Sequence, residues 1–159
     1  MPITQNEKLV FLKKGKEKEN DFFSLFNNTI EATKDDDINK HVDRFIVVGV
    51  DFKGLKKINR NDQETNEHIH WVELKNVFGK PGWLYGEADF FAFELKDYYV
   101  VVDKHDLQRF IADRCRNKIK VVKPELYKLY QRKDRKDIIT LVTSYDLCYI
   151  CTKIIKKKK

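Results

Sequence analysis

Asp43-Arg-Phe-Ile-Val-Val-Gly-Val-Asp-Phe-Lys53 is the stretch that decides the expected fold. It is an apolar run rich in β-branched residues, which is typical of a β-strand, and it ends in the acidic, apolar, basic triplet Asp51-Phe52-Lys53. Successive side chains of a strand point to opposite faces. We therefore expect Asp51 and Lys53 to share one face, while Val50 and Phe52 point into a core on the other.

The polar side chains of this run predict a metal-dependent site. If the chain turns near Gly49, Asp43 meets Asp51 and Lys53 at one end of a hairpin. Two carboxylates beside an ammonium form a site for a divalent metal and an activated water. Each part also has an ordinary structural interpretation. Asp43 can be a turn residue at the start of the strand, and Asp51 with Lys53 a solvated ion pair worth about 0–1 kcal/mol.

Length and composition indicate one globular domain inside a cell. The chain has 159 residues, of which 42% are hydrophobic and 13% aromatic, enough for one domain with a core and too few for two. The N-terminus lacks the apolar segment of a signal peptide, and no apolar run is long enough to cross a bilayer. We therefore expect a cytoplasmic protein that is not bound to a membrane.

The basic charge predicts a polyanion as partner. The net charge is +7, to which the four terminal lysines contribute. A basic region from Lys118 to Lys136 is interleaved with tyrosines, and it is interpreted either as a DNA-backbone surface or as a soluble face. The expected nucleic-acid contacts are Lys75, Lys80, Lys128, Arg132 and Arg135.

The cysteines indicate a reducing compartment rather than a disulfide framework, because their number, three, is odd. Cys148 and Cys151 are separated by two residues, and a second pair that would complete a zinc site is missing. At this spacing both side chains would lie on one face of a helix. We expect core packing, with a metal or redox role as the alternative.

Periodicity along the chain predicts a mixed α/β fold in a single domain, with a central mixed sheet flanked by helices. Residues 1–19 are interpreted as a charged lead-in, 20–155 as the domain and 156–159 as a basic tail. Two strands are expected within 43–57, and single strands at 68–75, 89–95, 98–102 and 138–143. A tight turn at Lys96 and Asp97 joins the strand at 89–95 to the strand at 98–102. Helices are expected from 20 to about 33, from a cap at Asp106 to Cys115, from Pro124 to Tyr130, and from a cap at Asp146 to Ile154.

The order of acidic residues resembles the PD-(D/E)XK nuclease superfamily. The matching parts are Glu31 on the first expected helix, Asp43, and the Asp51-Phe52-Lys53 triplet. The later segments at 71–77 and 82–89, which contain Glu73, look like segments of uncharacterised phage- and virus-type members. The resemblance covers roughly residues 20–117. Val42 precedes Asp43, where the family pattern has proline.

This resemblance implies a restriction-endonuclease-like fold and hydrolysis of phosphodiester bonds in DNA. Asp43 and Asp51, with Glu73 or Glu31, would hold Mg²⁺, for which Mn²⁺ can substitute, and Lys53 would assist the attacking water. Small basic members include Holliday-junction resolvases, which act as dimers, so the resemblance also suggests a homodimer. RNA stays open as a substrate, and a viral protein would act in the host cytoplasm.

Other interpretations of the same residues remain. Glu73 and Lys75 form a second acidic-x-lysine triplet, which would be the active one if Asp51 is the upstream aspartate. His68 and His70 with Glu73 are a weak zinc pattern. The glycine-rich loop from Gly79 to Gly86 could bring backbone to a phosphate and Trp83 to a base, or be an ordinary loop. The chain could also be an inactive nuclease-like fold that binds DNA or a host protein, or a structural domain with a basic tail.

Overall fold

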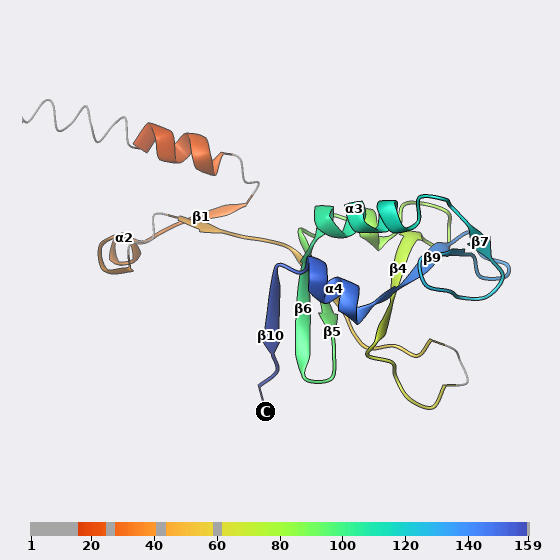
Figure 1. Cartoon of the computed structure of the whole chain (residues 1–159). Coiled ribbons are helices and arrows are strands. Elements are labelled where there is room, and N and C mark those ends of the chain that lie inside the picture. Colours follow the sequence, from red (N-terminus) through yellow and green to blue (C-terminus); the bar gives the residue numbers. More distant parts are fainter. Residues whose placement is uncertain (1–15, 25–27, 41–43, 59–61, 159) are drawn as a thin grey trace, which may run out of the picture. The chain divides into compact units, whose positions relative to one another are not determined.

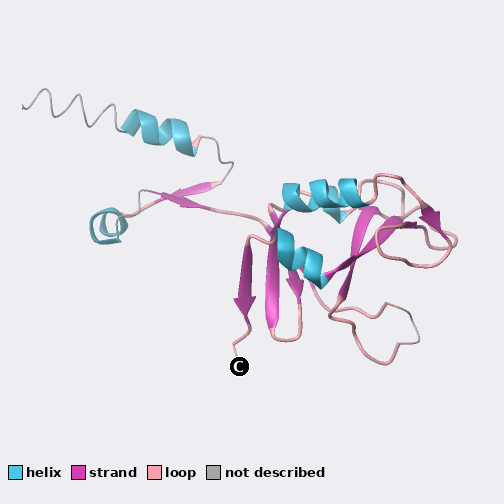
Figure 2. Cartoon of the chain, in the orientation of Figure 1, coloured by secondary structure: helices cyan, strands magenta, loops and turns pink. Residues whose placement is uncertain are grey.

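The structure, a computed structural model, describes residues 16–24, 28–40, 44–58 and 62–158 (Figure 1). Contacts within the chain divide it into two units, Met1–Val48 and Gly49–Lys159. The expected boundary between residues 19 and 20 does not coincide with this division. The mixed α/β class is confirmed, because strands and helices are interspersed along the chain (Figure 2).

The first unit contains a two-stranded sheet and short helical segments. Residues 16–23 are helical, α2 spans Lys34–Lys40, and β1 (Thr29–Glu31) pairs antiparallel with β2 (Arg44–Ile46). The predicted helix from 20 to 33 is therefore wrong at Thr29–Glu31, which is a strand. A capping box fixes the start of α2. The Thr33 hydroxyl oxygen accepts from the Asp36 amide at 3.2 Å, and the Asp36 carboxylate accepts from the Thr33 amide at 3.1 Å.

The central sheet of the second unit is mixed. Its strands lie in the order β10 (Lys153–Lys156), β6 (Tyr98–Asp103), β5 (Phe90–Glu94) and β3 (Val50–Lys53). β5 and β6 form the predicted antiparallel hairpin, and β10 pairs antiparallel with β6. β3 is a parallel edge strand against β5. A parallel pair needs a crossover connection, and the residues between β3 and β5, which include β4, provide it.

The hairpin predicted around Gly49 does not form. β2 pairs with β1 and β3 pairs with β5, so the two apolar halves of the opening stretch belong to different sheets. Gly49 is bound to the start of β5 instead. Its amide donates to the Asp89 carboxylate at 2.7 Å, and its carbonyl accepts from the amides of Asp89 and Phe90 at 2.9 and 3.1 Å. Asp43 lies outside the described residues.

A second sheet lies in the order β4 (Ile69–Lys75), β9 (Ile138–Thr143), β8 (Leu129–Tyr130) and β7 (Lys120–Val121). β4 and β9 form its long antiparallel pair, at the positions where the sequence predicts strands. The helix predicted from Pro124 to Tyr130 is wrong. Tyr127 has a φ of 59°, in the left-handed region that an α-helix excludes, and β8 begins two residues later.

Two helices of the second unit, α3 (Lys104–Arg114) and α4 (Ser144–Ile150), pack on the central sheet with the short 3₁₀ helix η1 (Trp83–Tyr85). Asp103 caps α3 and Thr143 caps α4, so the predicted caps Asp106 and Asp146 lie in the first helical turns. The fully buried core side chains come from both sheets, both helices and η1: Val72, Leu84, Phe91, Phe93, Val100, Val102, Leu107, Val142 and Leu147.

The end of the chain is a strand where the sequence predicts a helix to Ile154 and a basic tail. α4 ends at Ile150, and β10 includes Lys156. The Lys157 ammonium lies 2.7 Å from the Glu94 carboxylate. Cys148 and Cys151 pack against the core, as predicted. In the described part of the chain, no helix combines the length and the apolar character that crossing a membrane requires.

Candidate nucleic-acid site

The charged residues of the Asp51-Phe52-Lys53 triplet face the inner side of the central sheet. In the register with β5, Asp51 lies opposite Phe91 and Lys53 opposite Phe93, and both phenylalanines are fully buried. Val50 and Phe52 point to the other face, where they are 54% and 56% exposed. The prediction that these two apolar residues enter the core is therefore wrong, because Phe91 and Phe93 occupy it on the face that Asp51 and Lys53 share.

Lys53 lies between a carboxylate and an indole ring. Its ammonium is 2.6 Å from the Asp51 carboxylate, and the two side chains are 17% and 36% exposed. The same ammonium is 4.1 Å from the centre of the Trp83 ring, a cation–π distance. Trp83 in turn packs edge-on against Phe91, with ring centres 4.8 Å apart. The pair is therefore held at the edge of the core and is not a fully solvated surface pair.

Gly82 joins Trp83 to β4, the strand that carries Glu73. The Gly82 amide donates to the Leu74 carbonyl at 2.9 Å. A Cβ atom at Gly82 would lie 2.7 Å from the carbonyl carbon of Glu73 and 2.8 Å from its Cγ, so the close approach requires glycine. A continuous series of contacts thus connects Asp51 and Lys53, through Trp83 and Gly82, to Glu73.

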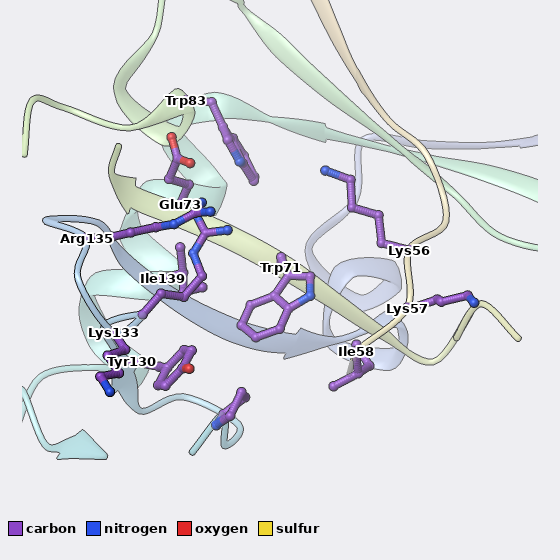
Figure 3. A pocket seen from close by; sticks show the side chains of 12 residues that line it. Lys56, Lys57, Ile58, Trp71, Glu73, Trp83, Tyr130, Lys133, Arg135 and Ile139 are labelled. Carbon is purple, nitrogen blue, oxygen red and sulfur yellow. The ribbon is translucent and has the colours of Figure 1, made fainter. Parts of the chain in front are cut away.

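Glu73 and Trp83 line a pocket of about 860 Å³, whose side chains are shown in Figure 3. It is bounded by residues 56–58, by β4, by η1 and by the segment from Pro124 to Ile139. The walls carry one carboxylate, Glu73, and five cationic side chains: Lys56, Lys57, Arg132, Lys133 and Arg135. Three aromatic residues complete them: Trp71, Trp83 and Tyr130. The pocket is therefore strongly electropositive and offers flat apolar surfaces.

A buried carboxylate holds one of these cations in place. Asp137 is fully buried, and its carboxylate accepts hydrogen bonds from the Arg132 side-chain Nε and, at 3.3 Å, from the Arg132 amide. The Arg132 side chain remains 40% exposed. An arginine anchored through Nε keeps its two terminal nitrogens as donors, so Asp137 positions Arg132 at the pocket.

The structure brings some of the predicted site residues together. Glu73, Arg132 and Arg135 line the pocket, and Asp51 and Lys53 adjoin it through Trp83. The lining does not include the other predicted nucleic-acid contacts, which are Lys75, Lys80 and Lys128.

The two remaining metal-ligand predictions fall elsewhere in the chain. Glu31 is on β1 of the first unit, where its carboxylate lies 3.4 Å from the Arg44 guanidinium. The sequence predicts Glu31 on a helix, and this prediction is wrong. Asp43 lies outside the described residues, so its role stays a prediction.

Sequence reasoning did not assign Lys56, Lys57 and Trp71 to the site as binding residues, and it covered Tyr130 and Lys133 only as part of the basic region from Lys118 to Lys136. Two signals were present in the chain. Lys56 and Lys57 closely follow the triplet along the chain, and Trp71 is two residues before Glu73 on an alternating strand, which puts both on one face. The approach of Tyr130 and Lys133 depends on the pairing of β8 with β9, which no local pattern reveals.

His70 belongs to the core and not to the pocket. It is buried on the β4 face opposite Trp71 and Glu73, and its Nε2 lies 3.0 Å from the Ser144 hydroxyl. Burial lowers the pKa of His70 to about 4. The zinc interpretation of His68, His70 and Glu73 loses support because the alternation of β4 directs His70 and Glu73 to opposite faces.

The carboxylates at the site are Asp51, beside Lys53, and Glu73, in the wall of the pocket. Among the described residues, no group of three or more histidine, cysteine, aspartate and glutamate side chains is placed to hold a metal ion. Mg²⁺ is usually held by one or two carboxylates together with waters and substrate phosphates. Asp51 and Glu73 provide carboxylate oxygens of this kind. Comparison with protein-family models, curated proteins and solved structures finds no match for the chain.

Proposed function

We propose that this chain is a Mg²⁺-dependent nuclease that hydrolyses phosphodiester bonds, with DNA as the first candidate substrate. The observation that carries the proposal is the inward orientation of Asp51 and Lys53 beside the electropositive pocket. Moving a charged pair out of water costs free energy that its own attraction often does not recover. A pair placed at the edge of the core, next to a pocket for an anion, therefore favours a role in chemistry over a role in stability.

The charges of the pocket support a nucleic-acid substrate. Five cationic side chains face a single carboxylate around the cavity, and a phosphate backbone is the polyanion that such a surface binds, with an affinity that falls as salt rises. The aromatic side chains favour nucleotides over other polyanions, because bases stack on them. The inward-facing Asp51 and Lys53 on an edge strand of a mixed sheet also support the restriction-endonuclease-like fold as part of this proposal.

Each charged residue has a distinct role in this proposal. Asp51 and Glu73 would hold Mg²⁺, which when bound lowers the pKa of a coordinated water and offsets charge on the phosphate. Lys53, kept in position by Asp51 and the Trp83 ring, donates to the attacking water or to a phosphate oxygen. Arg132 and the neighbouring cations hold the phosphates on either side of the reacting bond.

The test is cleavage of linear, circular, single-stranded and branched DNA, and of an RNA strand, with Mg²⁺ or Mn²⁺. The variants are Asp51→Asn, Lys53→Ala and Glu73→Gln, with a urea midpoint for each as a check on folding. We expect metal-dependent cleavage by the wild type and its loss in all three variants. Cleavage that survives in Lys53→Ala but is lost in Asp51→Asn and Glu73→Gln would move the chemistry to the second triplet.

The second candidate is a nucleic-acid-binding protein without turnover. The observation that favours it is the composition of the pocket wall, with five cationic side chains and three aromatic residues, because a surface of this kind needs no metal to bind a strand. Salt-sensitive binding, combined with no cleavage of any substrate by the wild type with either metal, would establish this function and reject the nuclease.

A further inference from the structure

Two aromatic side chains of the pocket are exposed to the cavity rather than used by the core. Trp71 is on the β4 face opposite the buried His70 and Val72. Among the described residues, the apolar side chains that pack on the core include Trp83 but neither Trp71 nor Tyr130. A tryptophan and a tyrosine that line a polar cavity without filling a core leave apolar surface in contact with water, which is unfavourable until a ligand covers it.

The two rings lie near each other and are tilted. Their centres lie 6.4 Å apart and their planes are inclined by 35°. Successive bases of a nucleic acid stack about 3.4 Å apart, so a flat base between two rings needs roughly twice this spacing. The distance of 6.4 Å between the ring centres is close to this spacing, so a base that enters the pocket has two aromatic rings beside it. Figure 3 shows Trp71 and Tyr130 with cationic side chains on both sides of them.

We propose that the pocket takes an unpaired nucleotide, with its base stacked on Trp71 and Tyr130 and its phosphates held by Arg132, Arg135 and Lys56. This inference rests on the proposed action on nucleic acid and names the form of the substrate as a single strand or an unpaired segment. A base within a duplex has both faces covered by its neighbours and must leave the stack before it can enter a pocket. The cavity of about 860 Å³ is in the size range of pockets for one small ligand.

Tryptophan fluorescence provides a direct test, because the chain has two tryptophans and both line this pocket. The full chain is titrated in EDTA, so that no cleavage occurs, with a twelve-nucleotide thymidine strand, with the corresponding uridine strand, and with the thymidine–adenosine duplex. We expect quenching by the single strands and at least about tenfold weaker binding of the duplex. The ratio of the affinities for the thymidine strand and the uridine strand tells whether DNA or RNA is preferred.

The variants Tyr130→Leu and Tyr130→Phe separate stacking from packing. Leucine keeps the bulk of the side chain at β8 but lacks an aromatic face, so we expect single-strand affinity to fall about fivefold to a hundredfold. Phenylalanine keeps the face, and its affinity should stay within about twofold of the wild type. Tyr149→Ala is the matched control, because Tyr149 is 82% exposed on α4 and does not line the pocket.

The outcomes distinguish this inference from the proposed nuclease. Duplex affinity equal to single-strand affinity, or equal effects of Tyr130→Leu and Tyr149→Ala, would overturn the unpaired-nucleotide pocket even if cleavage is observed. Single-strand preference with Tyr130-dependent quenching would support it even if the wild type cleaves nothing. If Tyr130→Leu lowers the urea midpoint by more than Tyr130→Phe does, the same comparison is made with Trp71→Leu and Trp71→Phe. Single-strand affinity that is retained in Trp71→Leu would then overturn the inference.

Discussion

Removing Arg132 should destabilise the protein, because it leaves the buried Asp137 carboxylate without its charged partner. Asp137 is fully buried, and its carboxylate accepts from Arg132 through both the side chain and the amide. Removing one partner from a buried ion pair costs about 3–5 kcal/mol. The hydrogen bond from the backbone amide at position 132 to Asp137 persists in Arg132→Ala. The Arg132 side chain is also 40% exposed. We therefore expect a decrease of about 2–3 kcal/mol in the free energy of unfolding.

A double-mutant cycle in urea measures this effect. Asp137→Asn removes the buried charge and keeps the side-chain shape, so Arg132→Ala with Asp137→Asn should be less destabilised than Arg132→Ala alone. Arg135→Ala is the control on the same loop, where we expect a change within about 0.5 kcal/mol. A loss below about 0.5 kcal/mol in Arg132→Ala, or strict additivity in the cycle, would refute the reasoning that Asp137 depends on Arg132 for its burial.

Three further predictions concern the core, the turn before η1 and the pocket. Burial holds the pKa of His70 at about 4, against 6.5 when exposed, so the unfolded chain binds a proton that the native chain does not. The free energy of unfolding should therefore fall by about 2 kcal/mol from pH 7 to pH 5, and a His70→Gln variant with the same pH dependence in urea would contradict this. Gly82→Ala places a Cβ within 2.8 Å of Glu73 Cγ, so it should lower the free energy of unfolding, measured by thermal unfolding, by about 2 kcal/mol. Gly49→Ala, whose Cβ meets its nearest atoms at 3.7 Å, should lower it much less. Arg135→Ala should reduce the slope of log affinity against log salt for a single strand by about 0.7, and an unchanged slope would remove Arg135 from the phosphate contacts.

Local patterns predicted the elements whose structure depends on neighbours in sequence. β4 is located from an alternating pattern that is interrupted where Trp71 and Val72 are adjacent. The β5–β6 hairpin is located from its tight turn at Lys96 and Asp97. The helices α3 and α4 were found, but each begins earlier than predicted. The sequence predicts Asp106 and Asp146 as the caps, and each lies three residues after the residue that caps its helix.

The orientation of β3 could not be predicted, because it depends on a distant strand. Val50 and Phe52 are more apolar than Asp51 and Lys53, and a strand considered alone would bury them. The parallel register with β5 places Asp51 and Lys53 on the face of Phe91 and Phe93 instead. The error is informative, since a charged pair on the inner face is the observation on which the proposed function rests.

The candidate site was predicted in part for the same reason. Glu73, Arg132 and Arg135 were named from the sequence and meet at the pocket. Tyr130 lies in the basic region from Lys118 to Lys136, at the end of a segment that the sequence predicts as a helix. It reaches Trp71 because β8 pairs with β9 and β9 pairs with β4. Contacts across three strands depend on the pairing of segments that are distant in the sequence, and such pairing produces no local pattern from which it could be predicted.

The central claim is that Lys53 takes part in metal-dependent cleavage at this pocket. The most direct measurement is the initial rate of Mg²⁺-dependent cleavage of a labelled single strand by the wild type, by Lys53→Ala and by Lys75→Ala, all at saturating protein. Lys75 is the matched control, because it is exposed and does not line the pocket.

We predict that the rate falls about 10²–10³-fold in Lys53→Ala, the effect of removing one donor to a developing negative charge, and stays near the wild-type rate in Lys75→Ala. Equal rates for Lys53→Ala and the wild type, or no cleavage by the wild type while single-strand binding persists, would contradict the claim.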